Sequence, residues 1–526
     1  MERHDTIVIG SGFGGAVMAL RLAQKGARVL VLERGRRWQR ETFPSLSGKD
    51  WWWDESAPHR RNGWLDFRYF GDMSVVQGAA VGGGSQIYAN VSIPAPPERF
   101  EHGWPAAISH AALVPHYQQV ARMMNVQLLP ENQLTARTQL MRDAAAAVGA
   151  ADRFRRVPLA VTFDPGWHYG LAQPFDHARS RTWINAQGQQ QGTCIHCGNC
   201  DIGCPVLAKN TLDLNYLADA ERLGAEIRPL HHVRCIEPLP EGGYRVTVHD
   251  LAAQRFHTLD AKRVVIAAGS IGSTELLLRC RDQYQTLPAL SGQLGKGWLS
   301  NGDFLTPAFY PDRDISPSRG PTITAAIDFL DGSENGARFF VEDGGFPDLL
   351  ANRMLRRKRF FLRLAPIERN RLAQALARMR GKRDPLSQMM PWFGQAVDEP
   401  GGRLSLGRRW YAPWRRDRLK LAWDYRAAEH AVEELVKMHS RLSAATGGRA
   451  VIPPTWRWLR NLVTPHPLGG CKMADSAAQG VVDHRGEVFG YPNLFVMDGA
   501  VVPVALGLNP SQTIAALAEH AATGIN

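Results

Sequence analysis

The first 33 residues of this chain constrain its fold more than any other stretch. Residues 6–9 form a short apolar run of the kind found in buried parallel strands. Gly10, Gly12 and Gly15 follow with G-x-G-x-x-G spacing and open a segment with small apolar residues on one helical face. Gly10 suits a tight turn, Gly12 lets backbone N–H groups approach a pyrophosphate, and Gly15 lets the helix pack close to the strand. The segment therefore predicts a strand–turn–helix unit that binds the phosphates of a dinucleotide.

A second apolar run and an acidic residue complete this unit. Residues 28–32 predict a second parallel strand, and Glu33 follows directly. An acid at this point accepts hydrogen bonds from the ribose hydroxyls of an adenosine. A glycine-rich loop in another kind of α/β protein is the alternative for the glycines alone, but it does not explain the register of both strands with Glu33. We therefore predict an α/β fold with a Rossmann-like domain, in which helices flank a central parallel sheet that binds an adenine dinucleotide.

Length and composition set the frame for this unit. A chain of 526 residues exceeds what one hydrophobic core usually supports, so we expect two joined domains. Its hydrophobic content of 44% and charged content of 21% are typical of globular enzymes. No apolar run reaches the length of a membrane span, and the first strand begins too early to leave room for a signal peptide. We therefore predict a cytoplasmic location.

The net charge of +12 is concentrated in one segment. Residues 353–383 contain twelve Lys and Arg and a single acid, Glu368, a net charge of +11. The rest of the chain is nearly neutral and has no helix-turn-helix or aromatic-interleaved basic motif, so a nucleic-acid partner is not expected. Because the segment mixes arginines with Phe360, Phe361 and leucines, it suits contact with anionic lipid at a membrane surface or with an acidic protein. A solvated insertion without a partner is the alternative.

Four further segments suit the same dinucleotide site. Residues 78–90 contain three consecutive glycines followed by Ser85. The backbone N–H groups of these glycines are not shielded by side chains and could contact phosphate or a flavin ring. A flexible loop is the alternative. Residues 263–280 predict another strand of the sheet, a glycine turn and a helix. Residues 227–235 predict a strand that could place Val233 beside adenine. Residues 493–503 predict an apolar strand that ends in an Asp-Gly pair.

Five motifs occur along the chain in one order. They are GSGFGG near the N-terminus, VGGGS at residues 81–85, HPLGGC at 466–471, the Asp498-Gly499 pair and NPSQTIAALAE at 509–519. Together they resemble the glucose–methanol–choline (GMC) oxidoreductases, and most closely their cholesterol-oxidase-like branch. The resemblance implies FAD as the cofactor.

The resemblance also implies how the two domains divide the chain. The FAD-binding domain is expected to be discontinuous and to comprise residues 1–95, 205–300 and 455–526. An α+β substrate domain built on an antiparallel sheet would comprise residues 96–204 and 301–454. The residues expected at the cofactor are Gly10, Gly12, Phe13, Gly14, Gly15, Glu33, Arg34, Gly82, Gly83, Ser85, Val233, Ala268, Gly269, Asp498, Gly499, Asn509 and Pro510.

Three residues are the candidates for catalysis. The resemblance implies that His466 hydrogen-bonds or deprotonates the substrate hydroxyl and that Asn509 orients it. Asn509 and Pro510 also predict a helix start, with Asn as the N-cap and Pro at the first helical position. The positive end of that helix would stabilise the anion that forms when hydride reaches flavin N5. Sterol oxidases also use a glutamate from the substrate domain, for which Glu342 is the candidate; a surface turn at Glu342 is the alternative.

Four of the seven cysteines form a compact run. Cys194, Cys197, Cys200 and Cys204, followed by a proline, have the C-x2-C-x2-C-x3-C-P spacing of ferredoxin iron–sulfur ligands. The run at 194–204 therefore predicts an iron–sulfur cluster, either a three-iron (3Fe-4S) cluster on three cysteines or one four-iron (4Fe-4S) cluster. Zinc or another metal, disulfides and free thiols are the alternatives.

These features predict an FAD-dependent oxidoreductase that oxidises an apolar secondary or sterol-like alcohol to a carbonyl. Hydride would pass from the carbinol carbon to flavin N5, and the electrons would then leave to O2 or to an electron-acceptor protein. A non-redox flavin lyase or photoenzyme of the same superfamily is one alternative, and an electron-transfer protein built on the cysteine run is another. An NAD-dependent enzyme is a weaker alternative because it has no role for the NPSQTI and HPLGG motifs.

Overall fold

The computed structural model describes residues 2–349, 386–409 and 412–525. The basic segment at 353–383 lies outside these residues, so its predicted contact with a membrane or an acidic partner stays a prediction. No helix in the described part of the chain combines the length and apolarity needed to cross a bilayer.

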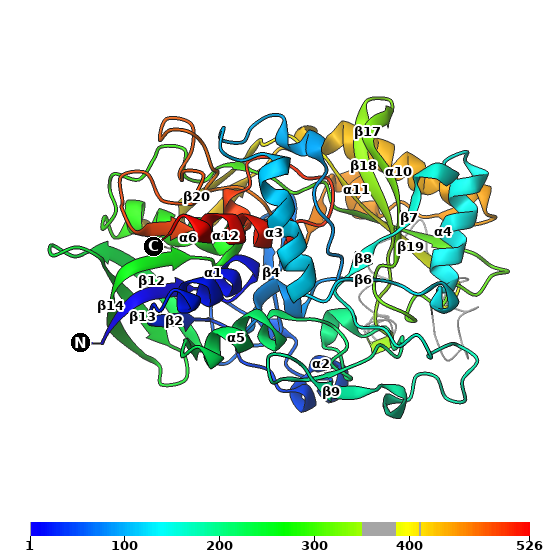
Figure 1. Ribbon diagram of the computed structural model, residues 1–526. Coiled ribbons are helices and arrows are strands. Elements are labelled where there is room, and N and C mark those ends of the chain that lie inside the picture. Colours follow the sequence, from blue (N-terminus) through cyan, green and yellow to red (C-terminus); the bar gives the residue numbers. More distant parts are fainter. Residues whose placement is uncertain (1, 350–385, 410–411, 526) are drawn as a thin grey trace.

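A seven-stranded sheet organises the half of the molecule that contains both chain termini (Figure 1). Its parallel part runs in the order β11, β2, β1, β14 and β24, and β13 and β12 continue antiparallel from β14. The strands are β1 (Arg3–Ile9), β2 (Val29–Leu32), β11 (Glu226–Arg228), β12 (His231–Pro238), β13 (Tyr244–Asp250), β14 (Arg255–Ile266) and β24 (Leu494–Val496). The predicted Rossmann-like sheet is confirmed. The single strand predicted over 227–235 is wrong, because Pro229 and the left-handed Leu230 (φ +59°) divide it into β11 and β12.

The turn after β1 depends on its glycines. Gly10 has φ +97°, a conformation that disfavours any side chain. A Cβ on Gly15 would lie 2.1 Å from the Gly10 carbonyl oxygen, so helix α1 (Phe13–Gln24) packs onto β1 only because this position has no side chain. Arg21 of α1 forms a bidentate pair with Glu519 of α12 (Ser511–Thr523), at 2.6 and 2.7 Å. The first and last helices of the chain therefore lie together on this half (Figure 1).

A six-stranded antiparallel sheet organises the other half (Figure 1). Its strands, in spatial order, are β22 (Arg449–Ala450), β16 (Phe304–Phe309), β19 (Met389–Ala396), β18 (Ala337–Asp343), β17 (Ala325–Glu334) and β7 (Phe154–Arg156). Helix α10 (Arg426–Ala445) packs on β18 and β19, and α4 (Ala136–Ala147) contacts α10 and β17. The predicted α+β half with an antiparallel sheet is confirmed.

Smaller sheets and helices complete the fold. A four-stranded sheet contains, in order, β23 (Leu462–Thr464), β5 (Met73–Gly78), β4 (Leu65–Tyr69) and β3 (Trp52–Trp53). A three-stranded sheet contains β15 (Lys296–Trp298), β20 (Gly402–Arg409) and β21 (Ala412–Ala422). Two-stranded sheets join β6 (Gln127–Leu128) to β8 (Pro158–Leu159) and β9 (Thr182–Ile184) to β10 (Gln190–Gly192). The remaining α-helices described are α2 (Pro44–Ser47), α3 (His110–Met123), α5 (Tyr216–Arg222), α6 (Gly269–Leu278) and α11 (Pro454–Leu459).

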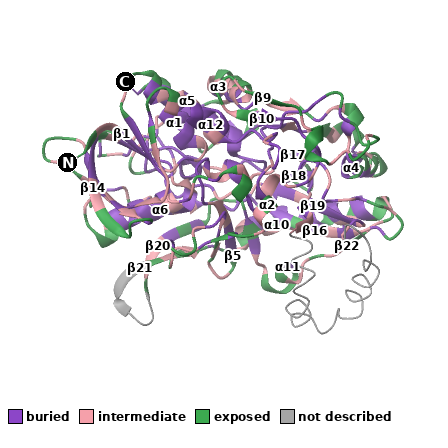
Figure 2. Cartoon of the chain, turned by 90° about the horizontal axis from the view of Figure 1, so that it is seen from below, coloured by how far each residue is buried: buried purple, intermediate pink, exposed green. Residues whose placement is uncertain are grey.

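The two large sheets draw their strands from the chain ranges expected for the two domains. Every strand of the seven-stranded sheet lies within 1–95, 205–300 or 455–526, and every strand of the antiparallel sheet lies within 96–204 or 301–454. The β20–β21 hairpin differs, because β20 contacts α6 of the nucleotide half although its residues were expected in the substrate domain. Buried residues run through both halves (Figure 2), and one apolar core includes strands of both large sheets. The exact domain boundaries stay a prediction.

Candidate active site

One cavity of about 1470 Å³ is lined by residues from both halves of the molecule. The glycine turn after β1 lies at its wall, as do Gly344 and Gly345 directly after β18 and Phe393 of β19. Of the predicted cofactor and catalytic residues, those that line it are Gly10, Gly12, Phe13, Gly14, Glu33, Arg34, Gly83, Val233, Ala268, Gly269, His466, Asp498, Gly499, Asn509 and Pro510. The cavity therefore brings together the N-terminal and C-terminal motifs that the sequence separates.

Gly15, Gly82 and Ser85 do not line this cavity, although the sequence predicted them at the cofactor. Gly15 serves helix packing, as described above. The Gly82 N–H donates to the Ser11 hydroxyl at 3.1 Å, and the Ser85 hydroxyl donates to the Gly82 carbonyl at 2.7 Å. Gly82 and Ser85 therefore stabilise the glycine loop through these hydrogen bonds.

The phosphate end of the cavity is built for close approach of a ligand to backbone. A Cβ on Gly83 would lie 2.6 Å from the Gly12 Cα, so the two glycine loops meet only without side chains. The Glu33 carboxylate accepts from the Ser11 N–H at 3.1 Å and from the Ser11 hydroxyl at 2.6 Å, and its other oxygen accepts from the Gly35 N–H at 2.8 Å. Glu33 thus holds the turn in place while it lines the cavity. This cradle fits the pyrophosphate and ribose of FAD.

Asp498 joins two strands at the next part of the wall. Its carboxylate accepts from the Gly269 N–H at 2.9 Å, from the Ser273 hydroxyl at 2.5 Å and from the Ala500 N–H at 2.7 Å. Burial raises the pKa of Asp498 to about 6, although these three donors oppose the shift. Asp498 therefore fixes the turn after β14 to the end of β24.

Asn509 differs in one respect from its prediction. Helix α12 begins at Ser511, with Pro510 in the N-cap position and no side-chain cap, so the predicted capping role of Asn509 is wrong. The Asn509 side chain lies at the cavity instead, and its Oδ1 is buried without a hydrogen-bond partner in the described part of the chain. A buried amide oxygen without a partner is costly, so this atom is suited to a ligand group.

His466 is held by an acid that the sequence analysis missed. Its Nδ1 lies 2.7 Å from Oδ1 of Asp303, and the Thr464 hydroxyl donates to the other oxygen of Asp303 at 2.5 Å. The His466 N–H donates to the Thr464 hydroxyl at 2.9 Å. Burial would lower the pKa of His466, but the charge of Asp303, its hydrogen bond and the nearby Glu342 raise it above its usual value. No sequence motif marks Asp303, which is 163 positions away from His466.

Glu342 is buried in β18, so the alternative of a surface turn is wrong. Its Oε2 accepts from the Gln395 side chain at 2.9 Å, while its Oε1 has no partner among the described residues. Burial raises the pKa of Glu342 to about 8, although the Gln395 hydrogen bond and the charge of His466 oppose the shift. Glu342 is not among the residues that line the cavity, and it is protonated at neutral pH.

Apolar side chains contribute to the cavity lining. Leu305, Ile323, Phe393 and Val463 are among them, and the Phe393 ring centroid lies 6.4 Å from that of His466. Such a lining favours an apolar ligand with few polar groups.

The four cysteines of the predicted cluster lie on one loop, residues 194–204. Cys194, Cys197, Cys200 and Cys204 are free thiols, and no group of three or more His, Cys, Asp or Glu side chains within residues 2–349, 386–409 and 412–525 could hold a metal ion. A buried lysine, Lys209, braces the loop instead.

The Lys209 ammonium donates to the carbonyls of Gln86 and Tyr88 at 2.9 Å and of Cys200 at 2.7 Å. The prediction of an iron–sulfur cluster therefore has no support in the geometry. Two neighbouring residues of the same loop, Asp201 and Ile202, line the cavity.

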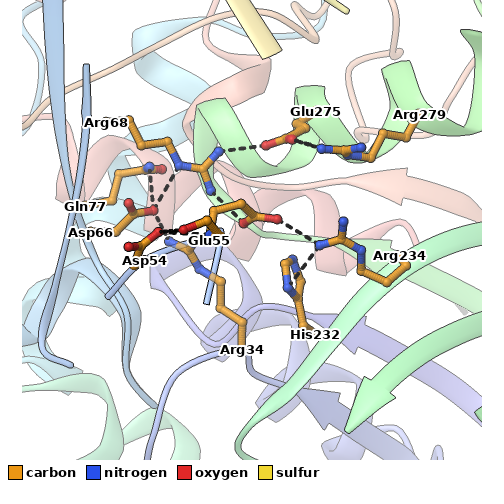
Figure 3. A network of polar contacts seen from close by, with 11 residues as sticks. Arg34, Asp54, Glu55, Asp66, Arg68, Gln77, His232, Arg234, Glu275 and Arg279 are labelled. Atoms are coloured by element: carbon orange, nitrogen blue, oxygen red, sulfur yellow. Dashed lines mark hydrogen bonds and ion pairs between the residues drawn. The ribbon is translucent and has the colours of Figure 1, made fainter. Parts of the chain in front are cut away.

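A network of buried charges lies at the wall near Arg34 and Val233 (Figure 3). Asp66 pairs with Arg34 at 2.9 Å and with Arg68 at 3.0 Å. Arg68 also pairs with Glu275 of α6 at 2.7 Å and with Glu55 at 3.3 Å. The sequence analysis found only Arg34, because the other members come from segments that meet only in the folded chain.

Glu55 connects the same network to strand β12. It accepts from Arg234 of β12 at 2.8 Å, and Figure 3 shows the two side chains facing each other beside His232. The network thus ties the segment that contains β3 and β4 to β12 and α6.

The fold and the site together define a flavin-type dinucleotide-binding oxidoreductase. The chain belongs to the GMC oxidoreductase family, whose N-terminal model matches residues 4–280 and whose C-terminal model matches residues 412–518. The predicted family and its FAD-binding fold are therefore confirmed.

Relatives of known name span nearly the whole chain. A cholesterol oxidase of Acinetobacter baumannii is 30% identical, over 98% of this chain and 93% of the relative. A cholesterol oxidase of Mycobacterium tuberculosis is 32% identical, over 99% of this chain and 90% of the relative. Among solved structures, pyridoxine 4-oxidase from Mesorbium loti covers 99% of this chain and 98% of its own, with a TM-score of 0.63 at 16% identity. That structural likeness supports the fold.

Proposed function

We propose that this protein is an FAD-dependent enzyme that oxidises an apolar secondary or sterol-like alcohol to a carbonyl. The observation that carries the proposal is His466, held by Asp303 at the wall of a cavity that also contains Asn509. The apolar side chains of Leu305, Ile323, Phe393 and Val463 in the cavity lining support an apolar substrate. The two relatives named cholesterol oxidase support the same class of alcohol.

His466 is proposed as the base that takes the hydroxyl proton. A carboxylate only accepts hydrogen bonds, so Asp303 places the ring proton of neutral His466 on Nδ1. The other ring nitrogen, Nε2, is then an acceptor for the substrate hydroxyl. FAD, when bound, supplies the acceptor for the hydride that leaves the carbinol carbon, at flavin N5. Asn509, whose Oδ1 has no partner among described residues, would orient the alcohol.

Glu342 is proposed as a neutral neighbour of this base. With a pKa of about 8 it holds its proton at neutral pH, so it cannot compete with His466 for the substrate proton. Its Oε1 has no partner in the described structure and would respond to the charge that His466 gains. The carboxyl group therefore tunes the histidine rather than acting as the base.

The cofactor residues that line the cavity are proposed to hold FAD from the phosphates to the flavin. Gly10, Gly12 and Gly83 would meet the pyrophosphate, Glu33 the ribose, and Val233 the adenine. For the electron acceptor we propose O2, which the oxidase names of the two relatives support. A flavin lyase and an electron-transfer protein have no comparable support.

A substrate panel tests this proposal. The purified holoenzyme is assayed for peroxide formation with a sterol, a smaller apolar secondary alcohol and a short polar primary alcohol. The apolar secondary alcohols should give the higher kcat/KM. Equal or higher kcat/KM with the polar primary alcohol would contradict the assigned substrate class.

A further inference from the structure

A short turn between β15 and β16 contacts the segments that carry both proposed catalytic residues. Within it, Asn301 and Gly302 adopt the left-handed conformation, with φ +57° and +60°. The conformation is uncommon for asparagine and costs free energy, so it persists only where surrounding contacts enforce it. Ser300 anchors the turn, because its N–H and hydroxyl both donate to buried Asp398 at 2.8 Å.

Asn301 holds the segment that leads into Asn509. Its Oδ1 accepts from the N–H groups of Leu506 and Gly507 at 3.0 Å, and its Nδ2 donates to the Leu508 carbonyl at 3.0 Å. All of these contacts are buried. The asparagine side chain thus satisfies three backbone groups directly before Asn509.

Asp303 holds His466 from the other end of the same turn. Its side chain is fully buried and has two partners on residues 464–466, the His466 ring at 2.7 Å and the Thr464 hydroxyl at 2.5 Å. The same hydroxyl receives the His466 N–H, so ring and backbone of the histidine are both fixed.

We propose that residues 300–303 form a positioning element for catalysis, in which Asp303 acts as the ionised partner that orients His466 and fixes its tautomer. Asn301 sets the backbone that presents Asn509. The inference rests on the proposed function for its catalytic consequence, while the Asp303–His466 pair itself stands on geometry. Asp303 and Asn301 are positioning residues, because neither of them lines the cavity.

The groups around the histidine decide the direction of the pH effect. Two acids act on His466, namely Asp303 of the turn and Glu342 of β18. Asp303 itself lies near a third acid, Asp398. Glu342 and Asp398 are neutral over much of the acidic range, because burial raises their pKa values to about 8 and about 7. Asp303 is therefore the main charge that keeps the pKa of His466 high.

The test compares Asp303→Asn with Asp303→Ala in the holoenzyme. Asparagine keeps a polar group of the same size but removes the charge. The rate of anaerobic flavin reduction by the alcohol should fall about 10²-fold or more in both variants. In Asp303→Asn the acid limb of the pH–rate profile should move to lower pH by roughly 1–3 units, because the histidine loses its anionic partner. A limb and a rate like those of the wild type would overturn the proposal.

Two matched variants separate positioning from general damage. Asp398→Asn removes another buried carboxylate that contacts the turn without touching His466, and it should leave the acid limb where it is. Asn301→Gly keeps the left-handed backbone but removes the three side-chain hydrogen bonds. It should therefore lower the rate of flavin reduction without shifting the acid limb of the pH–rate profile. A shift of the limb in either variant would argue that the turn acts only through overall integrity.

Histidine NMR of the holoenzyme separates this inference from the proposed function. The Nδ1 proton of His466 should give a strongly downfield, slowly exchanging signal that is lost in Asp303→Ala and in His466→Asn. If no alcohol reduces the wild-type flavin, the proposed function fails while this signal still decides the pair. If alcohols reduce the flavin and the signal is absent, the pair is wrong and the proposed function stands.

Discussion

The two ring nitrogens of His466 have different surroundings, and this asymmetry is what makes the residue useful. Nδ1 is hydrogen-bonded to the fully buried carboxylate of Asp303, so a proton taken up from a substrate can bind only at Nε2. Because the charge of Asp303 outweighs the effect of burial, the histidine is a stronger base than a buried histidine would otherwise be. For contrast, buried His439 beside Thr306 has its pKa lowered to about 3, because burial acts on it without an acidic partner.

Replacing His466 by alanine should leave FAD bound and slow flavin reduction about 10²–10⁴-fold, the usual scale for losing acid–base assistance. Stopped-flow measurement of the flavin absorption under anaerobic conditions gives the rate. His430→Ala is the control, since His430 is exposed and its ring lies 3.2 Å from the Asn335 carbonyl, away from the cavity lining. Unchanged reduction kinetics in His466→Ala would remove the histidine from the mechanism.

Replacing Glu342 by glutamine should change how stability depends on pH. The folded-state pKa of Glu342 is about 8, whereas an ordinary glutamate has a pKa of 4.5. The wild type therefore loses stability as pH rises from about 4.5 to about 8, because the unfolded chain releases this proton first. The difference in unfolding free energy between wild type and Glu342→Gln should fall by up to about 1.4 kcal/mol per pH unit in that range. Denaturant unfolding at several pH values measures it, and a pH-independent difference would show that Glu342 is ionised in the fold.

At the residue level, the sequence predicted those positions whose role follows from local pattern. Gly10, Gly12 and Glu33 belong to one continuous unit, so their spacing was enough to place them. Asp303 and Asn301 act on segments more than 150 positions away, and no short motif records such a contact. Asn509 lines the cavity, and its predicted capping role is wrong because Pro510 takes the N-cap position.

Among the elements, the segment that contains β3 and β4 has the clearest structural task. Its Glu55, Asp66 and Arg68 pair with arginines and a glutamate of the nucleotide half, and the network lines the cavity (Figure 3). Trp53 adds an aromatic face 4.0 Å from the Arg34 guanidinium. Because this wall adjoins Val233, we infer that the segment closes over the adenosine part of bound FAD.

Arg68→Ala should therefore weaken FAD retention. The change leaves Glu55, Asp66 and Glu275 short of a partner, and breaking a buried pair costs about 3–5 kcal/mol. FAD release, followed by the rise in free-flavin fluorescence on dilution, should be faster than in the wild type. Arg142→Ala is the matched control, because its pair with Glu131 is exposed and contributes little. Equal release rates in both variants would show that the network supports the fold alone.

The iron–sulfur prediction for the cysteine loop stays a prediction, and the contacts of the loop can be described without it. Cys194 and Cys204 accept hydrogen bonds from backbone N–H groups two and four residues on. Lys209 donates to the Cys200 carbonyl of the loop and to the carbonyls of Gln86 and Tyr88 outside it. The Cys194 and Cys204 thiols thus have local backbone partners. Spacing places four sulfurs on one loop, and the described residues form no metal-binding group there.

Lys209→Met should destabilise this loop more than Cys200→Ser does. The lysine variant leaves three buried carbonyls without a donor, whereas serine preserves the size of the cysteine side chain. Thermal unfolding of the two holoenzymes gives the comparison, together with iron and acid-labile sulfide analysis of protein prepared without oxygen. Stoichiometric sulfide that disappears in Cys200→Ser would restore the cluster and contradict this description of the loop.

For the whole molecule, the sequence supplied the architecture and left the substrate end open. The nucleotide half was predictable because its strands, glycine turns and acid follow local rules, and its three chain ranges contain all seven strands of the sheet. The antiparallel half carries few motifs, and its contribution to the cavity depends on which side chains of β16, β18 and β19 face inward. That choice follows from packing between distant segments, which no pattern in one chain records.

The most direct test of the account is an anaerobic titration of the holoenzyme with a sterol or another apolar secondary alcohol. The account predicts that the oxidised-flavin absorption is lost, that one carbonyl product forms per flavin, and that the process is much slower in His466→Ala. An oxidised flavin that no alcohol reduces, in protein with full FAD content, would contradict it.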